Sequence, residues 1–280
     1  MIKFTKMQGL GNDYVYVYCG DCNVSTSSMS SLARFVSDRH FGVGGDGIIL
    51  IGNSDVADFR MRIFNSDGSE AEMCGNGIRC VGKFVYDKGL TDKREISVET
   101  LAGIKKIWLN VEDKEVKSVR VDMGEPVLEC AKIPVNSEDR VIDIKADDRE
   151  FCVSCVSMGN PHGVTVVEDL ENFNIEKYGP ILECDKHFPN RANIEFVSIL
   201  DRKNIKMRVW ERGSSETLAC GTGACATMVA CNLNGWVENK VNVHLLGGTL
   251  EIEWNKENNH VYMTGPAKTV FEGELDYDNN

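Results

Sequence analysis

Two cysteines of this 280-residue chain each stand directly before a glycine-rich segment that opens an apolar run. Cys74 begins the sequence Cys-Gly-Asn-Gly, and Cys220 begins the sequence Cys-Gly-Thr-Gly. The two positions are 146 residues apart (220 − 74 = 146), and the same shift aligns residues 58–80 with residues 204–226 without a gap. The sequence therefore repeats a thiol together with its surroundings.

Each glycine-rich segment predicts a cysteine at the start of a helix. Backbone N–H groups there have no intrahelical partner, and the positive end of the helix dipole favours a thiolate over a thiol. The neighbouring glycines let a ligand carboxylate approach the same N–H groups. Two such thiols on opposite faces of an amino acid can remove the α-proton and return one to the other face, while the N–H groups stabilise the carbanion. The pattern thus predicts racemisation or epimerisation without a cofactor.

A cysteine considered alone is more often a small buried hydrophobe, and we expect that role for most of the other cysteines. The chain has 11 in all. An odd count, with no export signal in residues 1–6, indicates reduced thiols and the cytoplasm. The charged fraction of 26% is that of a globular protein, and the net charge of −12 argues against a nucleic-acid partner. No apolar run is long enough to span a membrane, so no membrane partner is expected.

Two Cys-x-x-Cys pairs have the spacing of zinc ligands. Cys152 and Cys155 fall in a segment that is predicted as a strand, where residues three apart point to opposite faces and cannot share an ion. We therefore expect them to be buried free cysteines. Cys19 and Cys22 follow a predicted strand, and a turn is the better interpretation of that segment. No metal site is expected.

Residues 42–47 match the pattern G-x-G-x-x-G of dinucleotide-binding loops. Such a loop follows a strand and precedes a helix, whereas here residues 32–40 are predicted as a helix and residues 48–51 as a strand. The order is reversed, so a dinucleotide site is rejected. His162 stands in a loop, Asn-Pro-His, that resembles an earlier Gly-Asn-Asp loop, but a lone histidine is more often a polar surface residue.

The repeat extends beyond the cysteines, because residues 96–110 resemble residues 241–255, and each copy is predicted as two strands joined by a glycine turn. A period this long indicates two homologous domains. We predict a first domain from 1–119 plus 266–280 and a second from 120–265. The strand-like residues 268–271 are expected to return to the first domain.

The helix after Cys220 is apolar on nearly every side over residues 224–233, so it must be buried all round. It is predicted to end at Gly235, as the first helix is at Gly89. The fold class expected is α+β, with two homologous tandem domains. Each is predicted to be a curled, mostly antiparallel sheet or barrel around a central buried helix, with the active site in the cleft between the domains.

The chain resembles the diaminopimelate epimerase family along essentially its whole length. The resemblance is carried by Asn-Ser-Asp-Gly-Ser at 65–69, by the segments that begin at Cys74 and Cys220, and by Glu-Arg-Gly at 211–213. It is also carried by motifs at 11–13, 159–162, 191–193 and 265–266. The resemblance implies a cofactor-free, cytoplasmic enzyme that interconverts LL- and meso-2,6-diaminopimelate on the route to lysine and peptidoglycan. It also implies a homodimer.

The resemblance implies a role for each site residue as well. Cys74 and Cys220 are the two bases, and Asn12 lies close to the reacting centre. The carboxylate at that centre is held by Gly75, Asn76, Gly221 and Thr222. The rest of the substrate, including its distal ammonium and carboxylate, is bound by Asn65, Asn160, Asn193, Glu211 and Arg212. His162 and Glu211 tune the protonation of the thiols.

Two positions depart from the family pattern. Gly47 replaces a glutamine of some relatives, so a side-chain contact there is lost or taken by water. Ser215 replaces a glycine, and a positive φ at this position would strain it by about 1–2 kcal/mol. Three alternatives stay open: a proline racemase-like enzyme with another amino acid as substrate, a non-catalytic amino-acid-binding module, and a redox sensor that uses Cys74 and Cys220.

Overall fold

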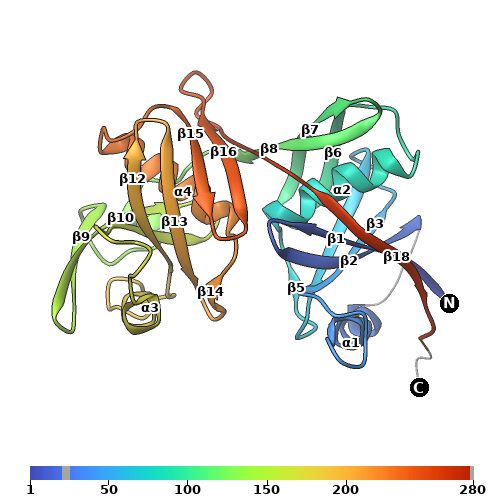
Figure 1. The fold of residues 1–280 in the computed structure, drawn as a ribbon, viewed down its shortest axis with the longest axis horizontal. Coiled ribbons are helices and arrows are strands. Elements are labelled where there is room, and N and C mark those ends of the chain that lie inside the picture. The colour runs from blue at the N-terminus through green and yellow to red at the C-terminus, as the bar shows by residue number, and fades with distance from the viewer. Residues whose placement is uncertain (21–25, 278–280) are drawn as a thin grey trace. The chain divides into compact units, whose positions relative to one another are not determined.

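The computed structural model describes residues 1–20 and 26–277, which divide into two compact units. The first unit comprises Met1–Val121 and Gly265–Asn280, and the second comprises Asp122–Thr264. Figure 1 shows the elements of both units by label.

The first unit contains a sheet and two helices. Its elements in chain order are β1 (Ile2–Gly9), β2 (Asn12–Gly20), α1 (Thr26–Ser37), β3 (Gly47–Gly52), β4 (Phe59–Asn65), β5 (Glu70–Ala71), α2 (Gly75–Asp87), β6 (Glu95–Thr100), β7 (Gly103–Glu112), β8 (Glu115–Gly124) and, from the C-terminus, β18 (Lys268–Leu275).

The second unit repeats this arrangement. Its elements are the short 3₁₀ helix η1 (Cys130–Lys132), β9 (Val141–Ala146), β10 (Arg149–Ser157), β11 (Pro161–Val166), α3 (Ile175–Glu183), β12 (Asn193–Asp201), β13 (Asn204–Glu211), β14 (Ser215–Thr217), α4 (Gly221–Leu233), β15 (Lys240–Leu245), β16 (Gly248–Trp254) and β17 (Val261–Gly265).

Strand pairing follows the same succession in both units. In the first, β18, β1 and β2 are antiparallel, β2 is parallel to β3, β3 is antiparallel to β4, β4 is parallel to β6, and β6, β7 and β8 are antiparallel. In the second, β9, β10, β11, β12, β13, β15, β16 and β17 repeat this succession in that order. The predicted fold class, an α+β protein with two tandem, mostly antiparallel repeats, is confirmed.

One helix is buried inside each curled sheet. Helix α2 packs against β1, β2, β7 and β18, and α4 packs against β10, β11, β12, β15 and β16. Strands from both ends of each pairing order therefore contact the same helix, which requires the sheet to curl around it. Ala224, Met228 and Val229 of α4 have no exposed surface, because a helix that is apolar all round can be stable only when it is enclosed.

A second helix covers the outer face of each sheet. In the first unit, Leu32 and Val36 of α1 join a core with Ile48 and Phe64. In the second, Tyr178 and Leu182 of α3 join a larger core. The strands in the middle of each sheet are thus covered on both faces, which explains why all six residues of β3 are buried.

The strand predicted at residues 268–271 is β18, and it pairs antiparallel with β1 from Ile2 to Gln8. The glycine-rich loop at 42–47 follows helix α1, which ends at Ser37, and leads into strand β3. It therefore joins a helix to a strand, the reverse of the order in a dinucleotide-binding loop, as predicted. The two glycines expected to end the inner helices, Gly89 and Gly235, both have positive φ (67° and 74°), and each lies two residues beyond the last helical residue.

The expectations for the Cys-x-x-Cys pairs are only partly met. Cys155 is a buried free thiol, but Cys152 is exposed, because it occupies the opposite face of β10. The prediction that both are buried is therefore wrong for Cys152. Cys19 is disulfide-bonded, which corrects the expectation that its thiol is reduced, and Cys22 lies outside the described residues. Within residues 1–20 and 26–277, no group of three or more potential metal ligands occurs.

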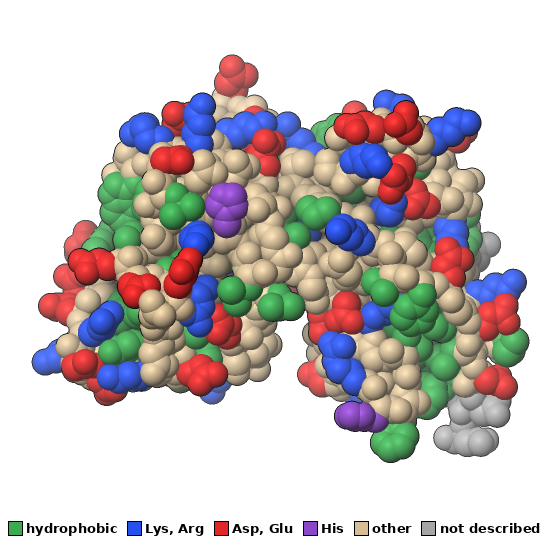
Figure 2. Space-filling model, in the orientation of Figure 1, with side chains coloured by type: hydrophobic (Ala, Val, Ile, Leu, Met, Phe, Trp, Pro, Cys, Tyr) green, Lys and Arg blue, Asp and Glu red, His purple; other side chains and the backbone are tan. Residues whose placement is uncertain are grey.

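Charged side chains of both signs are interspersed over the face shown in Figure 2. No helix in the described part of the chain is long and apolar enough to cross a membrane.

Candidate active site

Both cysteines cap the inner helix of their unit. Cys74 is the N-cap of α2, with an extended backbone (φ −137°, ψ 114°), and its Sγ accepts a hydrogen bond from the N–H of Gly77 at 3.3 Å. Cys220 is the N-cap of α4 (φ −114°, ψ 113°), and its Sγ accepts from the N–H of Gly223 at 3.4 Å. Sulfur here takes the place of the side-chain oxygen of an ordinary cap. Neither sulfur is part of a disulfide bond.

We call Cys74 and the residues around it the first half-site. Cys74 Sγ donates to the amide oxygen of Asn12 at 3.3 Å. The amide nitrogen of Asn12 donates in turn to Asp46 Oδ2 at 2.8 Å, and the backbone N–H of Asp13 reaches the same oxygen at 3.0 Å. The carboxylate of Asp46 therefore determines which end of the Asn12 amide faces the thiol.

Tyr14 belongs to the first half-site, although the sequence did not single it out as a site residue. The side chain is buried, and its hydroxyl interacts with Asn12 and with Cys74. Burial raises the pKa of Tyr14 well above its usual value, and the nearby Cys74 and Asp46 raise it further. The hydroxyl thus stays protonated and can donate to the sulfur. The register that pairs Tyr14 with Gly47 brings it there, and a register cannot be read from sequence spacing.

The other predicted residues of the first half-site lie around the start of α2. Gly75 and Asn76 are its first two residues, and Asn76 is buried. Asn65 ends β4, and its amide donates to Ser69 Oγ at 3.1 Å. A side chain at position 47 has no room, because a Cβ there would lie 2.1 Å from the carbonyl oxygen of Phe64. No glutamine at position 47 fits this backbone.

The second half-site surrounds Cys220 and contains more charge. Burial raises the pKa of the Cys220 thiol well above its usual value, and the carboxylates of Glu211 and Glu195 raise it further. The expectation that a helix N-terminus makes this thiol easier to ionise is therefore wrong for Cys220, because desolvation and like charge outweigh the N–H of Gly223. Thr222 Oγ1 lies 3.5 Å from the sulfur.

Glu211 lies close to the same thiol. Its carboxylate accepts from the hydroxyl of Thr217, and it also hydrogen-bonds with Cys220. Burial raises the pKa of Glu211, and Glu195 adds to this effect, while His162 opposes it. A carboxyl group whose pKa is raised in this way can exchange a proton with its surroundings more readily near neutral pH.

His162 is not a surface residue but is completely buried. Its Nδ1 lies 2.7 Å from Glu195 Oε1, and its Nε2 lies 3.0 Å from Asn160 Oδ1. Sequence reasoning missed Glu195, which has no exposed surface. A signal was present, since a glutamate in the otherwise apolar run at 194–197 needs a partner.

Asn193 and Arg212, two further residues of the predicted substrate-binding set, are bonded to each other. The amide nitrogen of Asn193 donates to the carbonyl of Pro161 at 3.1 Å, and its oxygen accepts from the N–H of Arg212 at 3.0 Å. The Arg212 guanidinium is exposed and donates to the carbonyl of Asn190 at 3.1 Å. No carboxylate of the described residues forms an ion pair with it. Its remaining donors suit a ligand carboxylate.

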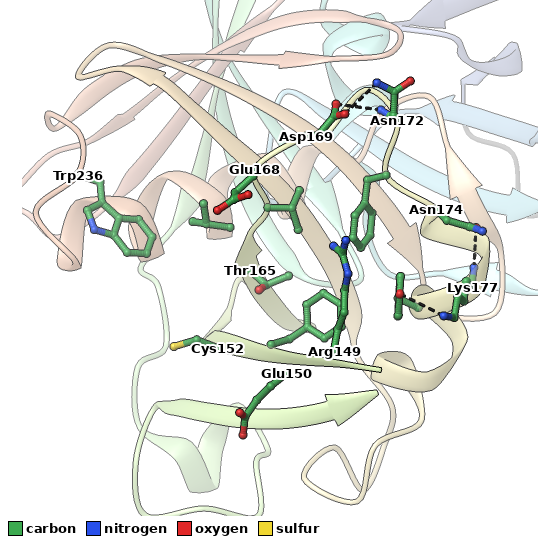
Figure 3. A pocket seen from close by; sticks show the side chains of 15 residues that line it. Arg149, Glu150, Cys152, Thr165, Glu168, Asp169, Asn172, Asn174, Lys177 and Trp236 are labelled. Atoms are coloured by element: carbon green, nitrogen blue, oxygen red, sulfur yellow. Dashed lines mark hydrogen bonds between the residues drawn. The ribbon is translucent and has the colours of Figure 1, made fainter. Parts of the chain in front are cut away.

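The second unit also contains a cavity of about 840 Å³ on its outer side, and Figure 3 shows the residues that line it. Arg149 lies over the rings of Phe173 and Tyr178, at 5.8 and 5.7 Å from their centroids. None of the predicted site residues lines this cavity.

The fold and the two capped cysteines define a class of two-repeat proteins. Among solved structures, the chain is similar to a phenazine biosynthesis protein of the PhzF family from Bacillus anthracis, with a TM-score of 0.72, 19% identity and 99% of both chains covered. It is similar to a probable proline racemase from Agrobacterium radiobacter K84, with a TM-score of 0.72, 14% identity, and coverage of 99% of this chain and 94% of that one. At these identities the likeness shows the fold alone.

Sequence comparison identifies the family within this class. The family model described as diaminopimelate epimerase matches residues 4–129 and 154–270. A diaminopimelate epimerase of Methanococcus maripaludis is 59% identical over 98% of this chain and 100% of its own length, and one of Acetivibrio thermocellus is 59% identical over 98% and 99%. The chain belongs to the diaminopimelate epimerase family.

Proposed function

We propose that this chain is an isomerase that interconverts LL- and meso-2,6-diaminopimelate, in lysine and peptidoglycan precursor biosynthesis, with Cys74 and Cys220 as its two bases. The observation that carries the proposal is that each thiol caps an enclosed helix in one of two equivalent half-sites. A single catalytic cysteine needs no such repetition, whereas inversion at carbon needs one base for each face.

In the proposed reaction, one thiolate removes the α-proton and becomes a thiol. The electron pair remains on the α-carbon and its carboxylate as a carbanion, which takes a proton from the second thiol on the opposite face and leaves that sulfur as the thiolate. Burial and two carboxylates raise the pKa of Cys220, which favours it as the thiol that supplies the proton. Cys74 acts as the base once it has given up the proton that it donates to Asn12.

Binding of the substrate uses the helix starts and the polar side chains around them. The N–H groups at Gly75, Asn76, Gly221 and Thr222 stabilise the charge that develops on the reacting carboxylate. Arg212 suits the distal carboxylate, and Glu211 suits an ammonium. Asn65, Asn160 and Asn193 complete the set. We propose that the domains predicted as 1–119 plus 266–280 and 120–265 contribute one thiol each, and that the enzyme works as a cytoplasmic homodimer.

The proposal is tested by incubating LL-diaminopimelate with the protein in deuterated water. The expected product is meso-diaminopimelate that contains deuterium at one α-carbon, and Cys74→Ala or Cys220→Ala should each abolish its formation, because one face of the α-carbon then has no thiol and inversion needs both. Proline incubated in parallel should not exchange. Full activity in either single variant would exclude the two-thiol mechanism.

A further inference from the structure

Glu195 occupies in the second unit the place that Ile49 occupies in the first. Ile49 pairs with Ile63 in the sheet, and Glu195 pairs with Val209, so both pairs are 146 residues apart (195 − 49 and 209 − 63). Ile49 Cδ1 lies 2.7 Å from where a Cβ would stand on Gly77, and Glu195 Oε1 lies 2.6 Å from the equivalent point on Gly223. An isoleucine is therefore enough to fill this position in the core, so packing alone does not explain a glutamate here.

Burial makes that glutamate costly. Glu195 has no exposed surface, and while its Oε1 meets His162, its Oε2 has no hydrogen-bond partner in the described part of the chain. A buried carboxylate is destabilising unless a charged or strongly donating group offsets its desolvation. His162 Nδ1, at 2.7 Å, is the group that does so. The proton between these two atoms fixes the orientation of the imidazole ring.

The orientation of the ring determines the orientation of Asn160. His162 Nε2 lies 3.0 Å from Asn160 Oδ1, and with that oxygen as the acceptor, Nε2 is the donor. The amide nitrogen of Asn160 is then left with its two N–H groups for another partner. Two N–H groups on one amide suit a carboxylate oxygen.

The first half-site orients its equivalent asparagine the other way round. Asn12 stands two residues before Tyr14, and Asn160 stands two residues before His162. In the sheet, Tyr14 pairs with Gly47 and His162 pairs with Asn193, and these two strand partners are again 146 residues apart (193 − 47). Asn12 gives its N–H to Asp46 and turns its oxygen to the Cys74 thiol. The two half-sites therefore differ in which end of the amide is held.

We propose that Glu195 is a positioning residue, which acts through His162 to make Asn160 present its N–H groups to a carboxylate of the substrate. This inference rests on the proposed function, which places diaminopimelate at Asn160. It assigns to Glu195 the substrate-binding part of the reaction rather than proton transfer.

The first test needs no activity and therefore stands apart from the proposed function. Nitrogen-15 NMR of the histidine side chains is recorded, and His162 is identified among the five histidines by loss of its signals in His162→Gln. In the wild type, the Nδ1 proton is expected far downfield because of its short bond to a carboxylate. Glu195→Ile, which copies the first unit, should remove that signal. Glu183→Gln is the matched control, a buried glutamate of the same unit bonded instead to Trp210 and Gly213, and should leave His162 unchanged.

The second test separates binding from chemistry. Glu195→Ile is expected to raise KM for diaminopimelate about tenfold, as the loss of one oriented hydrogen bond would. Because the charge of Glu195 also acts on Cys220, kcat is compared between Glu195→Ile and Glu195→Gln, which both remove that charge. Glu195→Gln, whose amide oxygen still accepts from Nδ1–H, should rescue most of the KM. The double variant Glu195→Ile with Asn160→Ala should have the same KM as Asn160→Ala alone, since both changes remove the same contact with the substrate.

Three results would overturn the proposal: unchanged His162 signals in Glu195→Ile, an unchanged KM in Glu195→Ile, or additive rises of KM in the double variant. If Glu195→Ile does not fold, Glu195→Gln decides the matter. A His162 Nδ1–H signal that is retained but lies less far downfield, together with a KM near that of the wild type, supports positioning, whereas a KM that rises while the signal is retained contradicts it.

Discussion

The Cys220 thiol is subject to two opposing influences. The N–H of Gly223 donates to its sulfur, and the N-terminus of α4 favours the thiolate. Burial favours the neutral thiol instead, and the carboxylates of Glu211 and Glu195 add to this effect. Together they raise the pKa of Cys220 well above its usual value. For this residue, desolvation and like charge outweigh the helix terminus.

Replacing Glu211 by Gln is expected to lower the pKa of Cys220, because it removes a negative charge beside the sulfur. Alkylation by iodoacetamide requires the thiolate, so its pH profile at Cys220 should move to lower pH. The modified Cys220 peptide is quantified by mass spectrometry at each pH. Glu216→Gln serves as the control, since that carboxylate pairs with Arg208 at 2.7 Å. An unchanged or upward-shifted profile in Glu211→Gln would show that Glu211 does not act on the thiol.

The short hairpins β4–β5 and β13–β14 repeat one stabilising feature. Arg62 holds Glu70 through Nε and one further nitrogen at 2.7 and 3.1 Å, and Arg208 holds Glu216 in the same way at 2.7 and 3.0 Å. Such two-point pairs fix geometry as well as adding stability. In both hairpins the paired glutamate stands four residues before the capping cysteine (74 − 70 and 220 − 216).

The turn of the second hairpin contains the strain that the sequence indicated. Ser215 has φ 64°, so the conditional expectation about this position is confirmed. Ser215→Gly should raise the free energy of unfolding by about 0.5–1 kcal/mol, because glycine adopts a left-handed backbone without a clash. Denaturant unfolding measures the change. Ser214→Gly, a neighbour that is equally exposed but without positive φ, should instead lower the stability by a similar amount. The same sign in both variants would contradict the strain argument.

At the scale of the whole chain, the first unit depends on a segment that is far from the rest of that unit in the sequence. Strand β18 pairs with β1 along nearly its whole length, and a Cβ on Gly273 would stand 2.7 Å from the ring of Phe4. The second unit, by contrast, is one continuous stretch, Asp122–Thr264. The two units therefore differ in their sensitivity to truncation at the C-terminus.

Deleting residues 266–280 is expected to destabilise the first unit and leave the second intact. Hydrogen exchange should show faster exchange in β1 and β2, which lose a pairing strand, while β12 and β13 keep their protection. Removing only residues 278–280 is the matched control and should change neither set, because Tyr277, which packs against the core of the first unit, is kept. Equal loss of protection in both units would mean that they do not fold independently.

The sequence by itself determined the repeat, the two helix-capping thiols and the enclosure of the inner helices. These depend on spacing and on local composition: a gapless shift of 146 residues, glycines directly after each cysteine, and an apolar run with no polar face. Local chemistry of this kind is present in the chain before any strand pairs with another.

Only the tertiary structure decided which side chains surround each thiol. Tyr14 reaches Cys74, and Glu195 reaches His162 across 33 residues, because strand register brings them together. Packing also decided that the face of β10 with Cys155 is covered and the face with Cys152 is exposed. The raised pKa of Cys220 has the same origin, since burial and the approach of two carboxylates are properties of packing, which no spacing along the chain contains.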